Sequence, residues 1–261
     1  MLKLKNYTVV MIHFVLFITF LSLFSGCKPN YHVVKIEGKQ IGIADPTAEN
    51  PELENFIKPY RDHINKDLDS VLAFCPETLD KSKGEWQTNI GNFMADVCLS
   101  ESNKIFSKRY GKIIDICLLN HGGIRSIIPK GNVTARTAFE VMPFENNMVV
   151  AALRGDQVME MVYYLIAEKK PHPLCGMQLV LDKNSNFKSV TINGQPLDPE
   201  KIYYVATSDY LVNGGDNMVF FQKSPHIFDL EYKIRNLLID YFKAVDTLQA
   251  SVTPRIIVEH N

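Results

Sequence analysis

The sequence lacks the closely spaced ligand pairs with which proteins usually hold transition metals. Its seven histidines never occur as His-X-His, and its five cysteines never occur as Cys-X-X-Cys. Such pairs place two ligands on one turn or strand, so their absence argues against a zinc site or a dinuclear hydrolytic centre. We therefore predict no metal and no other cofactor in this chain.

The sequence also lacks an excess of charge of either sign. It contains 28 lysines and arginines against 29 aspartates and glutamates, a formal net charge of −1, with never more than two basic residues in succession. A protein that binds the phosphate backbone of nucleic acid needs a basic patch. We therefore predict no nucleic-acid partner, while 46% hydrophobic residues indicate a chain with a globular core.

The start of the chain differs from the rest in hydropathy. Two lysines lie among the first five residues, an apolar run follows from Val9 to Leu23, and Ser25-Gly26 precedes Cys27. This order is typical of a secretory signal, and a cysteine after Ser-Gly is typical of a bacterial lipoprotein. The alternative is a retained membrane-spanning helix, for which the run is near the lower length limit. We predict that residues 1–27 are a lipoprotein signal peptide, that Cys27 accepts the lipid, and that the protein is exported and membrane-anchored, on the periplasmic side or at the cell surface.

Apolar periodicity and turn residues predict alternating helices and strands after a polar tether. Helical spacing predicts helices over residues 52–74, 88–97, 134–142, 156–170 and 230–245. Apolar and β-branched runs predict strands over residues 111–119, 147–153, 178–181, 188–192, 202–207 and 255–258. This order indicates an α/β fold with α+β-like layering, in which a mixed β-sheet is flanked by helices. We place a tether and an N-terminal helix in residues 28–80 and a single domain in residues 81–261.

A polar turn follows one of these predicted strands. Residues 111–119 form a largely apolar run, which indicates a buried strand, and Asn120-His121-Gly122-Gly123-Ile124-Arg125 comes next. Glycines permit positive φ and a close approach of other atoms, so Asn120 and Arg125 would be presented at a strand end. Ligands gather at such strand ends in α/β proteins. Glycine pairs after strands are more often simple turns, so this block alone does not establish a site.

Two further blocks occur later in the chain. Pro143-Phe144-Glu145-Asn146 is the second, and Tyr210 opens the third, which continues to Asn213-Gly214-Gly215-Asp216. Together the three resemble the blocks Asn-Gly-Gly-Gly-Ile-Arg, Pro-Phe-X-Asn and Asn-(Phe/Tyr)-Leu-X-X-Gly-Gly-Asp-Gly of the 5′-nucleotidase C-terminal domain family, over roughly residues 80 to 258. His121 stands where the family has glycine, and we expect it to replace that glycine because histidine tolerates a positive φ.

The resemblance implies a substrate-binding site made from these blocks. Phe144 and Tyr210 would clamp a nucleobase, because flat rings stack on both faces of a base. Asn120 would hydrogen-bond the base, Asp216 would hold the ribose hydroxyls and Arg125 would lie near the phosphate. The glycines of the predicted site are Gly122, Gly123, Gly214 and Gly215. The alternative is that Phe144 and Tyr210 are core aromatics and Asp216 a turn carboxylate.

The chain departs from the family at one upstream position. Some members have an arginine there that touches the substrate, whereas this chain offers Lys83 and Trp86. One ligand contact of the family is therefore not expected in the same form.

The catalytic half of the complete enzymes has no counterpart in this sequence. In those enzymes, the resemblance implies, a metallophosphatase domain with Asp-X-His, Gly-Asn-His and His-X-His segments holds two metal ions. Only about 50 residues separate Cys27 from the similar region, too few for such a domain. Our first hypothesis is a nucleotide- or nucleoside-recognition component of a split exported 5′-nucleotidase, with hydrolysis and divalent metals on a separate metallophosphatase polypeptide. The second is a stand-alone lipoprotein that binds nucleotides or nucleosides without hydrolysis, and the third is an interaction domain that has lost its ligand.

Overall fold

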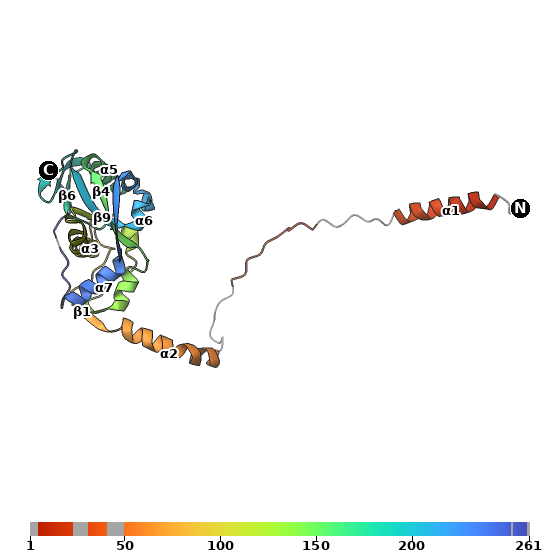
Figure 1. Cartoon of the computed structure of the whole chain (residues 1–261), viewed down its shortest axis with the longest axis horizontal. Helices are drawn as coiled ribbons and strands as arrows, with labels where there is room; N and C mark the ends of the chain where they lie inside the picture. Colours follow the sequence, from red (N-terminus) through yellow and green to blue (C-terminus); the bar gives the residue numbers. More distant parts are fainter. Residues whose placement is uncertain (1–4, 23–30, 41–49, 252, 260–261) are drawn as a thin grey trace. The chain divides into compact units, whose positions relative to one another are not determined.

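The computed structural model describes residues 5–22, 31–40, 50–251 and 253–259. Contacts divide the chain into two units, Met1–Pro51 and Glu52–Asn261. In the first unit, helix α1 (Lys5–Ser22) is described, and residues 31–40 have no regular secondary structure (Figure 1). Among the described residues, no helix combines the length and the apolar character that crossing a bilayer requires. Cys27 lies outside the described residues, so its lipidation stays a prediction.

The second unit is built around a five-stranded mixed sheet with the strand order β10-β4-β9-β2-β5. These strands are β10 (His226–Lys233), β4 (Asn147–Arg154), β9 (Ile202–Ser208), β2 (Ile116–Leu118) and β5 (Leu174–Cys175). β2 pairs with β9 in parallel, whereas the other neighbouring strands pair antiparallel. The predicted α/β fold with a mixed sheet is therefore confirmed.

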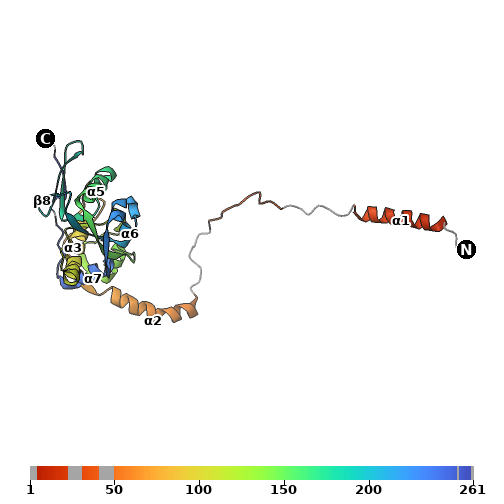
Figure 2. The ribbon, with the colours of Figure 1, turned by 45° about the horizontal axis from the view of Figure 1, so that its top comes forward.

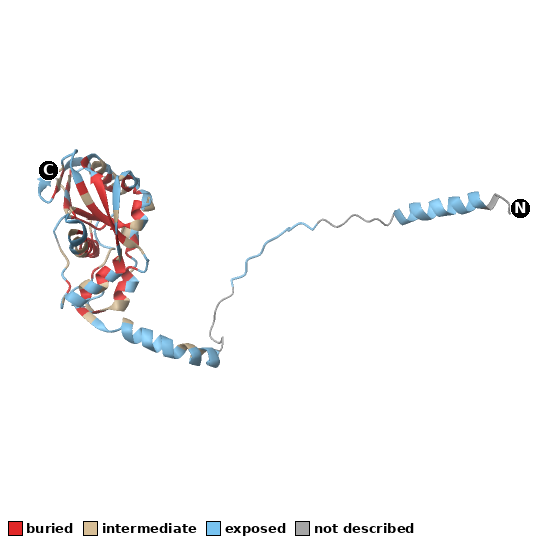
Figure 3. Ribbon diagram, in the orientation of Figure 1, coloured by how far each residue is buried: buried red, intermediate tan, exposed pale blue. Residues whose placement is uncertain are grey.

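Helices cover both faces of this sheet (Figure 1 and Figure 2). One buried cluster joins Val150 of β4 to α3 (Asn89–Tyr110), α4 (Ala135–Val141) and α7 (Ile234–Ala244). The other joins Val149 to α5 (Gly155–Glu168). The two valines serve different clusters because successive side chains of a strand point to opposite faces. β4 is buried at six consecutive positions, which explains why its sequence is continuously apolar (Figure 3).

Smaller elements complete the second unit. α2 (Pro51–Leu68) precedes a two-stranded sheet of β1 (Val71–Cys75) and β3 (Gly131–Thr134), and within α2 no residue is buried. A four-stranded sheet in the order β11-β6-β7-β8 contains β6 (Met177–Leu181), β7 (Phe187–Ile192), β8 (Gln195–Pro196) and β11 (Ile256–Val258). The short helices are η1 (His121–Gly123), α6 (Asp209–Val212), η2 (Gly215–Asn217) and η3 (Val219–Lys223).

α3 shows how local sequence sets both ends of an element. Thr88 caps its start, because the side-chain oxygen of Thr88 accepts a hydrogen bond from the Gly91 N–H at 3.0 Å. Gly111 ends it in the left-handed region, with φ at 65°. In its first turns the helix buries the apolar residues Ile90, Phe93, Met94 and Val97 in the core.

The helix predicted over residues 88–97 continues to Tyr110, and three other predicted boundaries are also wrong. The helix predicted over residues 52–74 ends at Leu68, because residues 71–75 form β1 and pair with β3. The helix predicted over residues 230–245 begins only at Ile234, because the residues before it extend β10 along β4. The strand predicted over residues 111–119 is reduced to β2, since α3 and its glycine cap extend to its start. Strand pairing with a distant partner overrides the local apolar period in the first two of these three cases.

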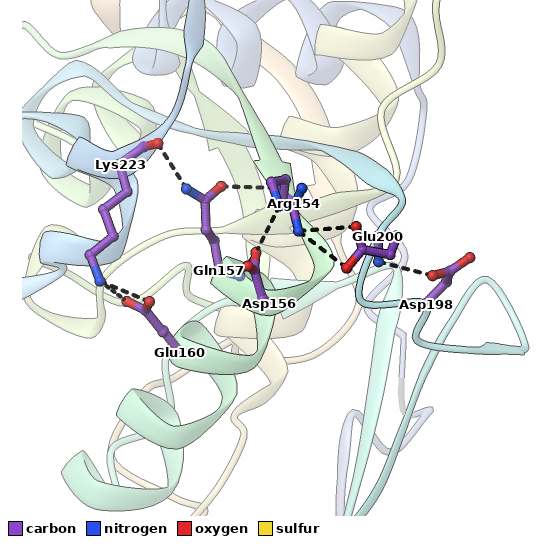
Figure 4. Close-up of polar contacts among 7 residues, drawn as sticks. All are labelled: Arg154, Asp156, Gln157, Glu160, Asp198, Glu200 and Lys223. Atoms are coloured by element: carbon purple, nitrogen blue, oxygen red, sulfur yellow. Dashed lines mark hydrogen bonds and ion pairs between the residues drawn. The ribbon is translucent and has the colours of Figure 1, made fainter.

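Polar contacts connect the start of α5 to two neighbouring segments (Figure 4). Gln157 Nε2 donates to the backbone carbonyl of Lys223 at 2.8 Å, and Arg154 Nη2 lies 3.2 Å from the carboxylate of Glu200. Exposed ion pairs of this kind contribute little individually. Their effect here is to connect β4 and α5 with η3 and with the loop before β9.

Candidate functional site

Sheet topology brings the three sequence blocks to one edge of the five-stranded sheet. β2 and β9 are parallel neighbours, so the turns that follow their carboxyl ends lie side by side. β4 runs antiparallel to β9, with Met148 opposite Ser208, so the loop that precedes β4 reaches the same edge. The blocks lie up to about 90 residues apart in sequence, and this edge is where an α/β sheet offers a ligand site.

A cavity of about 310 Å³ lies where the blocks meet. It is lined by Asn120, Gly122, Gly123, Arg125, Phe144, Asn146, Tyr210 and Asp216. The structure therefore brings together every predicted site residue except Gly214 and Gly215, and it adds Asn146 from the second block. The volume lies at the lower end of the range for small-ligand sites.

Asp216 is held in place from several sides. Its Oδ2 accepts a hydrogen bond from Asn120 Nδ2 at 2.7 Å, and its Oδ1 accepts one from the Tyr210 hydroxyl at 3.1 Å. The Tyr164 hydroxyl donates to the backbone carbonyl of Asp216 at 2.7 Å. Each carboxylate oxygen keeps a lone pair that can accept from a ligand hydroxyl, so the carboxylate is both fixed and available.

Two glycines of the cavity region allow side chains to approach the backbone closely. A Cβ on Gly123 would lie 2.7 Å from Asn120 Oδ1, and a Cβ on Gly215 would lie 2.4 Å from the ring of Tyr210. Real Cβ atoms do not come this close to other atoms, so a side chain at either position would displace Asn120 or Tyr210. Both turns thus fix the side chain of a predicted ligand contact.

The backbone of the two glycine turns differs from the expectation. Gly214 adopts a φ of 90°, but residues 121–123 form η1, and none of these three described residues has a positive φ. His121 therefore does not need the positive φ that was expected at this position, because the turn is a short right-handed helix that any residue can enter. Gly214 and Gly215 shape the second turn without lining the cavity.

Phe144 and Tyr210 present their rings to solvent. Phe144 is 41% exposed and Tyr210 is 45% exposed. Core aromatics would be almost fully buried, as Phe93 and Phe242 are, so the alternative that both are core residues is wrong. The guanidinium carbon of Arg125 lies 5.8 Å from the centre of the Phe144 ring. The aromatic and the cationic parts of the cavity are therefore adjacent.

Two cations lie beside this cavity. Arg125 is exposed, and its backbone is fixed by a 2.9 Å hydrogen bond from its N–H to the Val141 carbonyl. Lys81 Nζ donates to the Ile124 carbonyl at 2.6 Å, and burial followed by the charge of Arg125 lowers the pKa of Lys81. Sequence reasoning missed Lys81, because it lies outside the three blocks and only the fold places it near Arg125.

The two residues expected in place of the family's upstream arginine lie elsewhere. Trp86 is buried in the cluster that contains α5. Lys83 lines a different cavity, at the start of α3. Neither lines the cavity formed by the three blocks.

A second cavity, of about 350 Å³, shares Gly122 and Asp216 with the first. His172 lines it and is 5% exposed, and its Nδ1 accepts a 3.2 Å hydrogen bond from the His121 N–H. Burial lowers the pKa of His172 to about 4, so the ring is neutral near pH 7 and its Nε2 carries the proton. Within the described part of the chain this Nε2 has no hydrogen-bond partner. His172 thus holds the backbone of the first block by this hydrogen bond to His121. Sequence reasoning did not identify His172.

The match to a protein family covers most of these elements. Residues 72–223, more than half of the chain, match the model of the family described as 5′-nucleotidase, C-terminal domain. The chain belongs to this family. The resemblance expected from the three blocks is thereby confirmed, and every residue that lines the cavity lies within the matched range.

Individual relatives of this 5′-nucleotidase C-terminal domain are distant in sequence and longer. An apyrase from Tabanus yao is 23% identical over 235 residues, which span 82% of this chain and 42% of the apyrase. The trifunctional nucleotide phosphoesterase protein YfkN of Bacillus subtilis is 25% identical over 231 residues, 82% of this chain and 15% of YfkN. The crystal structure of a 5′-nucleotidase precursor from Thermus thermophilus shares the fold, with a TM-score of 0.66 at 24% identity over 80% of this chain and 43% of the precursor. The chain spans less than half the length of these relatives.

Proposed function

We propose that this chain is the nucleotide-recognition component of a split, exported 5′-nucleotidase. The observation that carries the proposal is the cavity itself, where Phe144, Tyr210 and Asp216 converge in a 5′-nucleotidase C-terminal domain. Two exposed rings and one fixed carboxylate are the groups that a nucleoside needs, since its base is flat and its ribose carries two neighbouring hydroxyls.

In this proposal the base enters between Phe144 and Tyr210. Stacking on aromatic side chains contributes on the order of 1–3 kcal/mol per base and tolerates different bases. Asn120 adds a polar amide beside the rings, and its bond to Asp216 keeps that amide in one orientation. The rings therefore supply affinity, and Asn120 supplies contact with the edge of the base.

The ribose and the phosphate extend from the base toward Asp216 and Arg125. The carboxylate of Asp216 accepts from the ribose hydroxyls, and the exposed guanidinium of Arg125 forks onto phosphate oxygens. Lys81 lies close enough to Arg125 for the charge of Arg125 to lower the pKa of Lys81, and it adds to the positive potential at that end of the cavity. A nucleoside monophosphate therefore matches the order of groups along the cavity.

Hydrolysis is assigned to a separate metallophosphatase polypeptide. The side chains that line the described cavity include one carboxylate and no histidine. Metal-activated water in phosphate hydrolysis needs several such ligands around the ions. The sequence offers no His-X-His pair to supply them, so the divalent metals belong to the partner in this proposal.

The proposal places both components outside the cytosol. The apolar run from Val9 to Leu23 and Ser25-Gly26 before Cys27 support export and anchoring by a lipid on that cysteine. The domain would then face the periplasm or the cell surface, where nucleotides from outside the cell arrive.

The test of recognition is a calorimetric titration of the full chain in detergent with adenosine, guanosine and their monophosphates. Phe144→Ala and Tyr210→Ala should each weaken binding by on the order of 1–3 kcal/mol, because each removes one stacking face. Tyr163→Ala is the matched control, since Tyr163 is 55% exposed on α5 and does not line the cavity. If the wild type and both cavity variants bind equally, or none of them binds, recognition by this clamp is wrong.

The test of the division of labour uses the same preparation with AMP and Mg²⁺ or Mn²⁺. The chain alone should release no phosphate, because its cavity lacks a set of metal ligands. Metal-dependent phosphate release by the purified chain would contradict a separate catalytic partner without affecting the recognition proposal.

A further inference from the structure

The loop that carries Phe144 is held from behind by the start of α7. Residues 143–146 connect α4 to β4, and Phe144 itself is 41% exposed. A ring has no strong hydrogen-bonding group of its own. The position of the Phe144 ring therefore depends on the contacts that hold the neighbouring residues of the loop.

Arg235 contacts both of those neighbours. It lies in the first turn of α7, and its side chain is 7% exposed. Its Nη1 donates to the Pro143 carbonyl at 3.2 Å, and its Nη2 donates to the carboxylate of Glu145. Its guanidinium carbon also lies 4.1 Å from the centre of the Phe139 ring on α4. One planar cation thus joins the helix before the loop to the residues that flank Phe144.

The hydrogen bonds that the Arg235 side chain donates go to this loop. Within the described part of the chain, both hydrogen bonds that it donates go to Pro143 and Glu145, and its buried Nε has no partner. Removing a buried guanidinium from water costs free energy, which hydrogen bonds and opposite charge offset. The two hydrogen bonds recorded for the Arg235 side chain both go to the loop, and its Nε has no partner among the described residues.

The residues before Arg235 reinforce the same loop. The Ile234 N–H donates to the Asn146 carbonyl at 3.0 Å, and Lys233 Nζ lies 2.7 Å from the other carboxylate oxygen of Glu145. The bonds from Lys233 and then from Arg235 hold the pKa of Glu145 at about 2, so this carboxylate stays ionised throughout the neutral range. Three consecutive residues at the end of β10 and the start of α7 therefore contact Pro143, Glu145 and Asn146, the residues on either side of Phe144.

We propose that Arg235 is a positioning residue for nucleobase binding, which fixes the Phe144 ring opposite Tyr210 through Pro143 and Glu145. This inference rests on the proposed function, because it assumes that Phe144 stacks on a base. Arg235 itself does not line the cavity, so this proposal assigns it no contact with the ligand. Its effect on affinity passes through the backbone of the loop.

The experiment compares Arg235→Lys with Arg255→Lys in the full chain in detergent, using calorimetric titration with adenosine and thermal unfolding. Arg255 is a matched control, because its side chain is 15% exposed, its Nε is also unpartnered within the described residues, and it forms a two-oxygen ion pair with Asp96 at 2.8 Å. It lines a cavity that shares no residue with the nucleotide cavity. Lysine keeps the charge at each position but loses the planar fork.

We expect both variants to melt at lower temperature but only Arg235→Lys to raise the Kd for adenosine, by about tenfold, as coupled neighbouring residues do. Because the effect passes through Phe144, adding Arg235→Lys to Phe144→Ala should change the Kd by less than about twofold. Equal changes of Kd in the two lysine variants would overturn the inference, and so would a full effect of Arg235→Lys in the Phe144→Ala background.

A surface variant keeps the inference testable if Arg235→Lys does not fold. Glu145 has a side chain that is 64% exposed and lies outside the cavity lining, so Glu145→Ala should fold. It removes one of the two anchors of Arg235 and should raise the Kd for adenosine by about threefold, again only when Phe144 is present. An unchanged Kd in Glu145→Ala would overturn the inference. If instead Phe144→Ala has no effect on affinity, the proposed clamp itself is wrong, and the inference falls with it.

Discussion

Asp216 combines a fixed position with unused acceptor capacity, and that combination gives a prediction for the ribose. Asp216→Asn keeps the shape but removes the charge, so adenosine and AMP should both bind more weakly, by about 2 kcal/mol for a hydrogen-bond acceptor that is charged. The free base adenine lacks the ribose and should be unaffected. Calorimetric titration with the three ligands checks this, and an equal loss for adenine would show that Asp216 acts on the base site instead.

Also at the residue scale, the buried ring of His172 predicts a pH dependence of stability. Its pKa is lowered by burial to about 4 in the folded protein, while the unfolded chain binds the proton near the usual value of 6.5. The unfolded state therefore gains the extra proton between about pH 6.5 and pH 4, and the free energy of unfolding should fall over that window by up to about 3 kcal/mol.

The variant His172→Asn isolates this effect, because asparagine does not titrate and can still accept from the His121 N–H. Urea unfolding of wild type and variant at pH 7.5 gives the cost of the substitution itself. As the pH is lowered to 4, the wild type should lose stability relative to the variant. Parallel curves for the two proteins would mean that His172 is not the source of the pH dependence.

At the scale of the element, α3 depends on its cap. The Thr88 hydroxyl is buried and accepts from the Gly91 N–H, so Thr88→Ala should leave a backbone donor unsatisfied. We expect the free energy of unfolding to fall by about 1 kcal/mol, with Thr88→Ser as the control that keeps the oxygen. Urea unfolding measures both, and an equal loss in the serine variant would assign the effect to the methyl group of threonine rather than to the cap.

Strand pairing, and not a local cap, sets the end of α2 and the start of α7. The apolar period alone continues from α2 into β1 and from β10 into α7, although the structure changes type within each run. The change occurs because β1 pairs with β3 and β10 pairs with β4, and each partner strand is more than 50 residues away in sequence. No local pattern contains that information.

At the scale of the whole molecule, the N-terminal segment predicts where the protein resides. If Cys27 accepts a lipid, Cys27→Ser should block processing or release the domain from membranes, whereas Cys75→Ser, at a buried cysteine of the domain, should not alter fractionation. Membrane fractionation and the size of the product on a gel provide the measurement. A Cys27→Ser protein that remains in the membrane fraction at the processed size contradicts the lipoprotein prediction.

The sequence by itself determined the family, the mixed α/β class and all the residues that line the cavity except Asn146. Glycine turns at strand ends are encoded locally, because only glycine allows the close contacts of Gly123 with Asn120 and of Gly215 with Tyr210. The three blocks could therefore be identified before any fold was known, and the family match confirms their assignment.

The tertiary structure alone decided which residues support that cavity. Lys81 reaches the Ile124 carbonyl from 43 positions away, and Arg235 reaches the Pro143 carbonyl from 92 positions away. His172 accepts a hydrogen bond from the His121 N–H, which lies 51 positions away in sequence. These contacts arise from the packing of separate elements. The sequence around a lysine, arginine or histidine does not indicate which distant residue its side chain will contact. The residues that face the ligand could therefore be predicted from the sequence, but the residues that support them could not.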